Sequence, residues 1–196
     1  PNVYGPFGHP YYNSVVATFC HQVSHGEEPK IEVDGQLKLI YVSELVSEII
    51  KNIEESVNDG ELWVNHTAES KVSELLDMLQ HYKSVYQDGG EVPEINNQFE
   101  HKLFNTYRCY MPKAEYFPRY FTKHTDNRGH FIELMRAGIS GQTSFSTTKP
   151  GITRGEHFHT RKIERFAVIQ GKAQIQLRRI GTDEVMSFEL NGENPS

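Results

Sequence analysis

The sequence has only two cysteines, Cys20 and Cys109, among its 196 residues. They lie far apart along the chain and share no metal-binding spacing. Disulfide frameworks and cysteine-built metal sites need several cysteines at paired or short spacings. Neither is expected here, and the two thiols are typical of a reduced, cytoplasmic protein.

The sequence also lacks long apolar runs, a signal segment and an excess of positive charge. No apolar run approaches the roughly 20 residues that a membrane-spanning helix needs. Twenty Lys and Arg residues stand against 26 Asp and Glu, which gives a formal net charge of −6. General nucleic-acid binders carry the opposite balance. We therefore expect no membrane and no nucleic-acid partner, and we expect a chain that begins at Pro1 to be an internal part of a longer protein.

The segment 151–171 carries the densest functional signal, with the sequence GITRGEHFHTRKIERFAVIQG. His157 and His159 are two positions apart, so on a β-strand both imidazoles leave the same face. A turn after them can fold Glu164 back beside them, and Gly151 and Gly171 stand where the chain must turn. Two imidazoles and a carboxylate suit a divalent metal such as zinc, iron, manganese or nickel. The segment therefore predicts a metal site.

Basic residues surround this segment in an otherwise acidic chain. The stretch 149–165 holds five cations and only two glutamates. Lysine and arginine groups of this kind bind phosphates, although a solvated charged loop explains Arg161 and Lys162 equally well. Lys149 and Arg154 remain candidates for binding an anionic substrate, and so does Arg128, because Arg128 and Arg154 each precede a glycine.

The pattern of apolar residues in the first half of the sequence predicts a mixed α/β structure. Residues 1–10 are rich in Pro, Gly and Asn and predict a loop. Apolar residues at helical spacing then predict helices near 11–25, 43–59, 70–88 and 97–110. Short strands are expected at 31–33, 36–42 and 61–66, the first two joined in a hairpin at Asp34-Gly35. The helix after Ser43 is expected to bury an apolar face made of Val46, Ile49, Ile50 and Ile53.

The pattern changes from helical spacing to short alternating segments near residue 113, where Met111-Pro112-Lys113 begins a linker. Short alternating segments follow and predict strands at 120–123, 130–135, 141–148, 163–170, 173–178 and 185–190. Such a run of strands is typical of an all-β barrel or sandwich. We therefore place a domain boundary at 113/114.

The second half resembles the cupin β-barrels. The spacing G-x5-H-x-H-x4-E-x6-G in 151–171 is similar to the first cupin signature, and the segments 126–131 (DNRGHF) and 141–146 (GQTSFS) resemble cupins that act on nucleotide-linked keto-sugars. The first half resembles the C-terminal, substrate-binding part of an extended short-chain dehydrogenase/reductase. That similarity rests on the segments 2–6 (NVYGP), 13–16 (NSVV) and 39–46 (LIYVSELV). Together they resemble bifunctional capsular-polysaccharide enzymes in which such a reductase is fused to a zinc cupin.

The resemblance implies a fold for each half. Residues 1–113 would be an α+β fragment of the extended reductase, and residues 114–196 a jelly-roll cupin barrel that stops before its second motif. A further histidine ligand would then lie beyond residue 196. The reductase's glycine-rich dinucleotide loop and its Tyr-x-x-x-Lys motif are not in this sequence. No NADPH-binding residue is therefore expected within it, and that site would lie upstream of residue 1.

The resemblance also implies an activity for the intact protein. The cupin would epimerise C3 of a UDP-linked 2-acetamido-2,6-dideoxy-4-hexulose, and the reductase would reduce C4 with NADPH, towards UDP-N-acetyl-L-fucosamine. Zinc would be held by His157, His159 and Glu164. Either histidine could instead be the catalytic base, and the sequence leaves these roles open. The protein would be a homodimer, and Asn13 would meet the nucleotide-sugar.

Three alternatives remain at this stage. The cupin could be another metal-dependent isomerase or an oxygenase. It could bind a sugar without catalysis. It could also serve only as a dimerisation barrel, which would leave the His and Glu cluster without a ligand.

Overall fold

The computed structural model describes residues 1–55, 60–138 and 141–195. The chain divides into two compact units, residues 1–152 and 153–196, which are described separately below. This division does not coincide with the predicted boundary at 113/114. That boundary separates the part that resembles a reductase from the part that resembles a cupin, and it stays a prediction.

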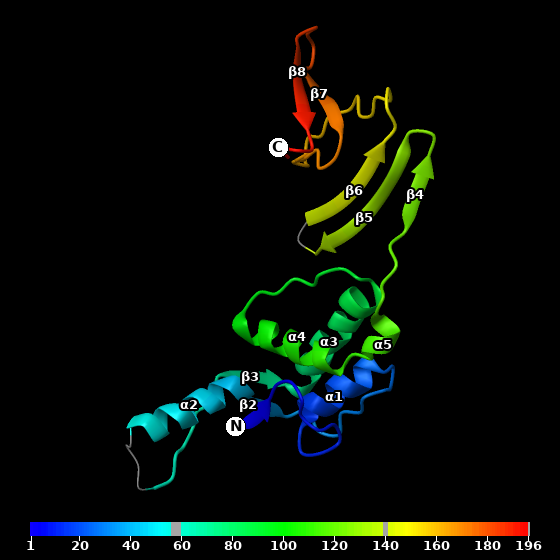
Figure 1. The fold of residues 1–196 in the computed structure, drawn as a ribbon. Helices are drawn as coiled ribbons and strands as arrows, with labels where there is room; N and C mark the ends of the chain where they lie inside the picture. Colours follow the sequence, from blue (N-terminus) through cyan, green and yellow to red (C-terminus); the bar gives the residue numbers. More distant parts are fainter. Residues whose placement is uncertain (56–59, 139–140, 196) are drawn as a thin grey trace. The chain divides into compact units, whose positions relative to one another are not determined.

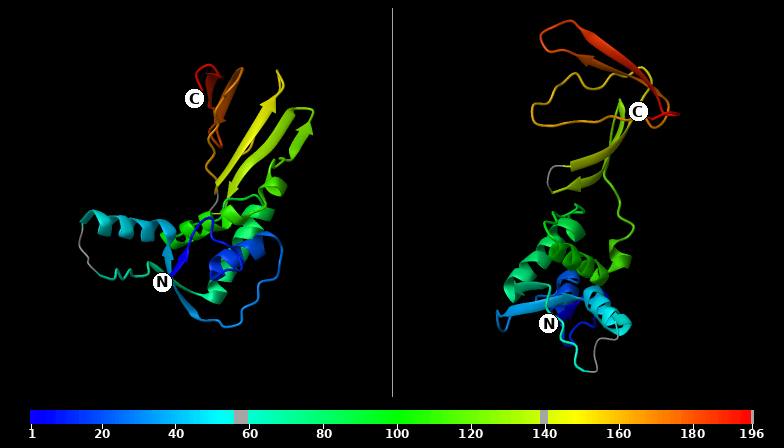
Figure 2. Two further views of the ribbon diagram at one scale, coloured as in Figure 1. Left: turned by 60° about the horizontal axis from the view of Figure 1, so that its bottom comes forward. Right: turned by 90° about the vertical axis from the view of Figure 1, so that its left-hand side faces the viewer.

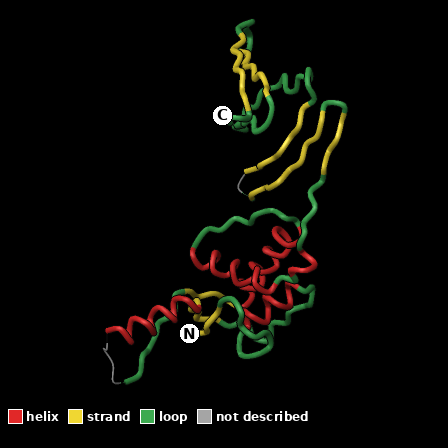
Figure 3. Tube along the Cα trace, in the orientation of Figure 1, coloured by secondary structure: helices red, strands yellow, loops and turns green. Residues whose placement is uncertain are grey.

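The order of elements is mixed α and β in the first 116 residues and β thereafter (Figure 1, Figure 3). The helices are α1 (Val15–Ser24), α2 (Val42–Glu55), α3 (Val72–Tyr82), the π-helix η1 (Lys83–Asp88), α4 (Gln98–Tyr110) and α5 (Lys113–Tyr116). The strands are β1 (Asn2–Tyr4), β2 (Gln36–Tyr41), β3 (Ala68–Lys71), β4 (Lys123–Asp126), β5 (Gly129–Ala137), β6 (Gly141–Thr148), β7 (Lys172–Arg178) and β8 (Val185–Asn191).

The first unit is built on a three-stranded sheet in the order β1-β2-β3. Strand β2 runs parallel to β1, pairing Val3 with Ile40, and antiparallel to β3. Helices α1, α3 and α4 pack against one another (Figure 1, Figure 2). Their apolar stripes form the core together with Tyr4 and Leu39 of the sheet, and its fully buried members include Val16, Cys20, Leu75, Leu79, Leu103 and Tyr107. The helical periodicity of these residues is thus confirmed.

The predicted hairpin at Asp34-Gly35 is wrong. Residues 31–33 form no strand, and β2 takes β1 and β3 as its partners instead. The carboxylate of Asp34 accepts hydrogen bonds from the backbone N–H and the hydroxyl of Ser73, at 2.8 and 2.9 Å. Those bonds satisfy a free N–H in the first turn of α3, so Asp34 serves as a helix cap rather than as a turn residue.

Helix α2 forms as predicted, but the expected burial of its apolar face is wrong. Val46, Ile49, Ile50 and Ile53 are 45, 42, 47 and 70% exposed. Their spacing places them along one stripe of the helix, and among the described residues this stripe is only partly covered. The predicted strand at 61–66 is also wrong, because these residues are irregular and the strand lies further on, at β3.

Strands β4, β5 and β6 form an antiparallel sheet, also within the first unit. The bounds of β6 agree with the predicted strand at 141–148, and β5 extends the predicted strand by a residue or two at each end. The first strand of this sheet lies at 123–126 rather than at 120–123. A register shift interrupts the β5–β6 pairing between Glu133 and Met135.

The second unit contains the hairpin of β7 and β8. The predicted strands at 173–178 and 185–190 are confirmed, and Ala173, Ile175 and Leu177 stand opposite Leu190, Phe188 and Met186. Alternation of this kind predicts one buried face, and that burial is wrong here, because Leu177, Met186 and Phe188 are 52, 59 and 46% exposed. The predicted strand at 163–170 is wrong, because within the described residues this segment has no strand to pair with. The strands that the structure describes form two open sheets and one hairpin, not a closed barrel. The fold prediction is therefore confirmed only as mixed α and β. Along the described part of the chain, no helix combines the length and apolarity needed to cross a membrane.

Candidate metal and substrate site

The candidate metal ligands lie in the irregular segment between β6 and β7. Gly151, Gly155 and Gly171 all have left-handed backbone conformations, with φ of 76°, 103° and 77°. Glu156 shares that conformation at φ 56°, although it carries a side chain. A non-glycine residue with φ in this range is uncommon and is often found at functional sites.

His157, His159 and Glu164 form a cluster in the second unit. One ligand atom from each lies within 4.8 Å of the others. The two imidazole rings are 4.8 Å apart between centroids and meet edge to face at 71°. The Nε2 atom of His159 lies 3.3 Å from Oε2 of Glu164. The expected convergence of these three side chains is therefore present, although an irregular segment rather than a strand carries them.

Glu164 is held in its charged form by its surroundings. Lys162 donates a hydrogen bond to Oε1 of Glu164, and this bond lowers the pKa of the Glu164 carboxyl below its ordinary value. Nearby His159 and His157 lower the pKa further. An ionised carboxylate is the form that binds a metal. Lys162, however, occupies one of the two oxygens that the metal would use.

The donor set fits a divalent metal of the zinc type. Two imidazoles and one carboxylate are a ligand set found in catalytic zinc sites, where a fourth position remains open. Ligand atoms around a tetrahedral zinc lie about 3.3–3.6 Å apart, so atoms already within 4.8 Å need only small side-chain rotations. His157, His159 and Glu164 would hold such an ion, and its identity stays a prediction.

Arg128 and Lys149 meet at one end of the β4–β5–β6 sheet in the first unit. The backbone N–H of Lys149 donates to the carbonyl of Arg128 at 2.9 Å. The guanidinium of Arg128 is bound by Asp126, with Nε and Nη2 at 2.8 and 2.6 Å from Oδ2. This pair lowers the pKa of Asp126 to about 2. Arg128 therefore stabilises the β4–β5 turn, and two of its three guanidinium nitrogens, Nε and Nη2, are already hydrogen-bonded to Asp126.

The remaining two predicted residues lie apart from each other. Arg154 is half-buried in the second unit, three positions before His157. Asn13 lies in the first unit, where it has a left-handed φ of 51° directly before Ser14, the N-cap of α1. Phe7 and Tyr11 share the left-handed conformation, so the loop before α1 is locally strained. Strain of this kind is consistent with the predicted role of Asn13, because strained loops cluster at binding sites.

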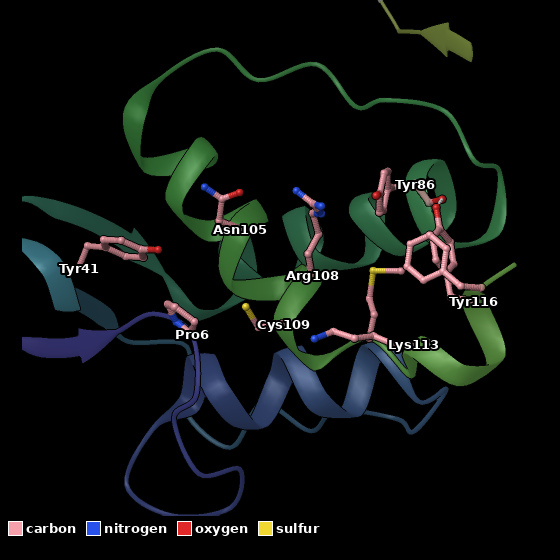
Figure 4. A pocket seen from close by; sticks show the side chains of 10 residues that line it. Pro6, Tyr41, Tyr86, Asn105, Arg108, Cys109, Lys113 and Tyr116 are labelled. Atoms are coloured by element: carbon pink, nitrogen blue, oxygen red, sulfur yellow. Dashed lines mark hydrogen bonds between the residues drawn. The ribbon is translucent and has the colours of Figure 1, made fainter. Parts of the chain in front are cut away.

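The sequence reasoning missed a concave site in the first unit, a pocket of about 380 Å³ beside α4 and α5. A signal for it was present. Aromatic residues alternate with cations through the stretch 104–121, FNTYRCYMPKAEYFPRYF. Of these aromatic and cationic residues, Arg108, Lys113, Tyr116 and Phe117 line the pocket (Figure 4), whereas Phe104 and Tyr107 are buried in the core.

Comparison with known proteins supports the resemblance. Residues 124–196 match the family described as the polysaccharide biosynthesis C-terminal domain. The chain is 32% identical over 195 residues to the UDP-2-acetamido-2,6-beta-L-arabino-hexul-4-ose reductase of Pseudomonas aeruginosa, covering 98% of this chain and 52% of that protein. It is also 30% identical over 83 residues to the spore coat polysaccharide biosynthesis protein SpsL of Bacillus subtilis, covering 37% of this chain and 55% of that protein.

Solved structures agree with the sequence relatives. The capsular polysaccharide assembling protein CapF from Staphylococcus aureus has a TM-score of 0.84 at 32% identity, over 100% of this chain and 53% of that one. CapF with the inhibitor 3-isopropenyl-tropolone has the same TM-score at 33% identity, over 57% of that chain. The predicted resemblance to capsular-polysaccharide enzymes of this kind is thus confirmed. The chain spans about half the length of the curated relatives it matches.

Proposed function

We propose that this chain is part of a bifunctional enzyme that modifies a UDP-linked 4-keto-6-deoxy sugar for capsular polysaccharide. All of this chain is similar to about half of CapF. The second half would epimerise C3, and the reductase of the intact protein would then reduce C4 with NADPH, towards UDP-N-acetyl-L-fucosamine. The name of the Pseudomonas relative, a reductase of a UDP-linked hexul-4-ose, supports the substrate class. The observation that carries the epimerase part is the cluster of His157, His159 and Glu164.

The chemistry of a 4-keto sugar explains why such a cluster is useful. The hydrogen on C3 is acidified by the neighbouring carbonyl, and its removal leaves an enolate. Return of a proton to the opposite face inverts the carbon. A divalent metal bound to the cluster would supply Lewis-acid polarisation of the carbonyl oxygen, which lowers the barrier to proton removal. His157, His159 and Glu164 would orient the sugar by holding that ion in place.

The short distance between His159 and Glu164 favours a second role for the cluster, in which a histidine is the catalytic base. The carboxylate of Glu164 lies 3.3 Å from His159 Nε2, where it would stabilise a protonated imidazole. His159 could then take the C3 proton itself, with Glu164 as its orienting partner. Activity that survives removal of all divalent metal would favour this second role, and loss of activity that returns with added zinc would favour the first.

Cationic side chains support binding of the diphosphate. Arg154 lies in the same unit as the cluster, and Arg128 and Lys149 lie together at the end of their sheet. Asp126 occupies Nε and Nη2 of Arg128, which leaves Nη1 for a phosphate oxygen. We propose contacts to the nucleotide-sugar for each unit separately: by Arg154 in the second unit, and by Arg128, Lys149 and Asn13 in the first.

Product analysis of the intact protein tests the proposal. The UDP-4-keto sugar and NADPH would be supplied, and the configuration at C3 of the reduced product would be read by NMR. We expect inverted C3 from the wild-type protein, and C3 of unchanged configuration, or no product, from the His157→Ala and Glu164→Gln variants. Inverted product from both variants would rule out the cluster as the epimerisation site.

A further inference from the structure

The end of α1 carries two histidines one helical turn apart. His21 and the C-cap residue His25 have the i, i+4 spacing that places side chains on the same face of a helix. Their imidazole rings are 4.1 Å apart between centroids, with planes at 30°. Two histidines at this spacing can bind one metal ion together, as they do in the helical His-x-x-x-His motif of zinc proteases. The first unit therefore has two adjacent metal-ligating side chains of its own, outside the cluster of the second unit.

The turn that ends α1 brings a carboxylate to the same place. The chain passes through Gly26, which has a left-handed φ of 74°. The N–H of Gly26 donates to the carbonyl of Val23 at 3.2 Å, and the N–H of Glu27 donates to the carbonyl of Gln22 at 2.9 Å. These are the two hydrogen bonds of a Schellman helix end, which requires a left-handed residue and so favours glycine. The reversal of the chain places Oε1 of Glu27 3.7 Å from Nε2 of His21.

Hydrogen bonds to His25 and Glu27 leave one ligand atom of each for a metal. Nδ1 of His25 lies 2.9 Å from the carbonyl oxygen of His21. A carbonyl only accepts, so Nδ1 carries the proton and Nε2 of the neutral ring keeps its lone pair. Oε2 of Glu27 accepts a hydrogen bond from the hydroxyl of Tyr11, which leaves Oε1 on the side of His21. Metal-binding histidines and carboxylates characteristically have their second polar atom held in this way.

We propose that the end of α1 binds one divalent transition-metal ion of the zinc, nickel or copper class, through Nε2 of His21, Nε2 of His25 and Oε1 of Glu27. Imidazole ligands suit these metals, and the partial negative charge at the C-terminus of a helix favours a cation there. Among the described residues, only the cluster of the second unit already has three ligand atoms within 4.8 Å of one another. Binding at α1 therefore requires the carboxylate of Glu27, on an exposed side chain, to turn towards the two rings.

A bound ion would also stabilise the loop before α1. Tyr11 belongs to that loop, and its ring meets the ring of His21 edge to face, at 5.7 Å and 77°. Its hydroxyl donates to Glu27, and its backbone N–H donates to Oγ1 of Thr18 at 2.9 Å. Tyr11 thus contacts two of the three ligands, so an ion that fixes those ligands also restricts Tyr11. The role of the ion would be structural, in a loop that also carries Asn13.

Histidine modification locates the ion in the intact protein. Diethyl pyrocarbonate would be added, and its reaction with His21 and His25 would be followed by peptide mass spectrometry in the presence of zinc, nickel or magnesium chloride. We expect saturating zinc or nickel to slow both reactions by about tenfold or more. Magnesium should have no effect, because it prefers oxygen ligands. His101, an exposed histidine of α4, is the internal control and should react at the same rate throughout.

Variants test the ligands one at a time. His25→Gln and Glu27→Gln should each raise the zinc concentration that half-protects His21, by about tenfold. Glu28→Gln removes the next carboxylate along the chain, which is also exposed, and should leave that concentration unchanged. Circular dichroism would confirm that each variant is folded.

A further variant separates this site from the cluster of the second unit. His157→Ala should leave the protection of His21 by zinc unchanged, because His157 lies in the other unit. The proposal is overturned if zinc and nickel protect neither His21 nor His25, or if His101 or magnesium shows the same protection. It is equally overturned if His25→Gln or Glu27→Gln is protected like the wild type, or if His157→Ala abolishes protection.

Discussion

The Nε2 atom of His159 lies 3.3 Å from Oε2 of Glu164, while the other oxygen of the same carboxylate is bound by Lys162. A single carboxylate thus faces an imidazole on one side and an ammonium on the other. The ammonium neutralises charge that a metal ion would use, so Lys162 and a bound metal compete for Glu164.

This competition predicts that Lys162→Met strengthens metal binding. Exposed ion pairs are weak, so the expected gain in zinc affinity is about two- to fivefold. Isothermal titration calorimetry of the intact protein with zinc measures it. Lys172→Met removes an exposed lysine at the start of β7 and serves as the matched control. An unchanged or weaker affinity in Lys162→Met would show that the ammonium does not compete for Glu164.

The β4–β5 turn should lose stability in acid through Asp126. Hydrogen bonds from Arg128 lower the pKa of Asp126 to about 2 in the folded protein, against about 3.9 in an unfolded chain. A lowered folded-state pKa stabilises the fold above the unfolded pKa, and this stabilisation is lost as pH falls from about 4 to about 2. Asp126→Asn should therefore lower the denaturation midpoint at pH 7, and the difference from wild type should shrink towards pH 3.

Asp77→Asn is the control for that pH dependence. Asp77 is exposed on α3, so its replacement should leave the midpoint unchanged at both pH values. A gap between Asp126→Asn and wild type that stays constant from pH 7 to pH 3 would contradict the role given to the Asp126–Arg128 pair.

Glu44 should contribute to stability more than its neighbours on α2. Its carboxylate accepts hydrogen bonds from the backbone N–H of Tyr41 at 3.1 Å and from Thr67 Oγ1 at 2.7 Å, and it pairs with Lys102 of α4. It thereby ties the ends of β2 and α2 to α4. Glu44→Gln should lower the free energy of unfolding by about 1–2 kcal/mol. Glu48→Gln, at an exposed position on the same helix, should change it little, and equal losses in urea denaturation would contradict this account.

Variants of Asn13 can distinguish an effect on folding from an effect on substrate binding. Its left-handed φ of 51° is open to glycine and strained for alanine. Asn13→Gly should therefore keep the stability of the protein, and Asn13→Ala should lose some. If the Asn13 side chain contacts the nucleotide-sugar, both variants should raise KM. A Gly variant with unchanged KM would assign Asn13 to the backbone turn alone.

Much of the regular structure could be predicted from local patterns. The stripe of Val72, Leu75, Leu76 and Leu79 gives α3 and its buried face, and the alternation of Ile175 and Leu177 gives β7 and the face of the hairpin on which these side chains lie. These patterns succeed because one element's periodicity is fixed by its own backbone geometry. The convergence of His157, His159 and Glu164 was predictable for a similar reason, since all three lie within eight residues.

Features that depend on distant residues were not predictable in this way. Asp34 resembles a hairpin turn residue, but its partner is Ser73, 39 positions away. The apolar stripe of α2 predicts burial, yet what lies over such a stripe depends on packing that its own sequence does not encode. The segment 163–170 has the composition of a strand, but a strand forms only beside a partner that supplies its hydrogen bonds.

Hydrogen exchange at C3 of the sugar tests the central claim most directly. The intact protein would be incubated with the UDP-4-keto sugar in deuterium oxide without NADPH, and loss of the C3 proton signal would be followed by NMR. The account predicts exchange by the wild-type protein and at least a hundredfold slower exchange by the His157→Ala and Glu164→Gln variants. Exchange that proceeds at the wild-type rate in both variants, or no exchange by wild-type protein that still binds the sugar, would contradict it.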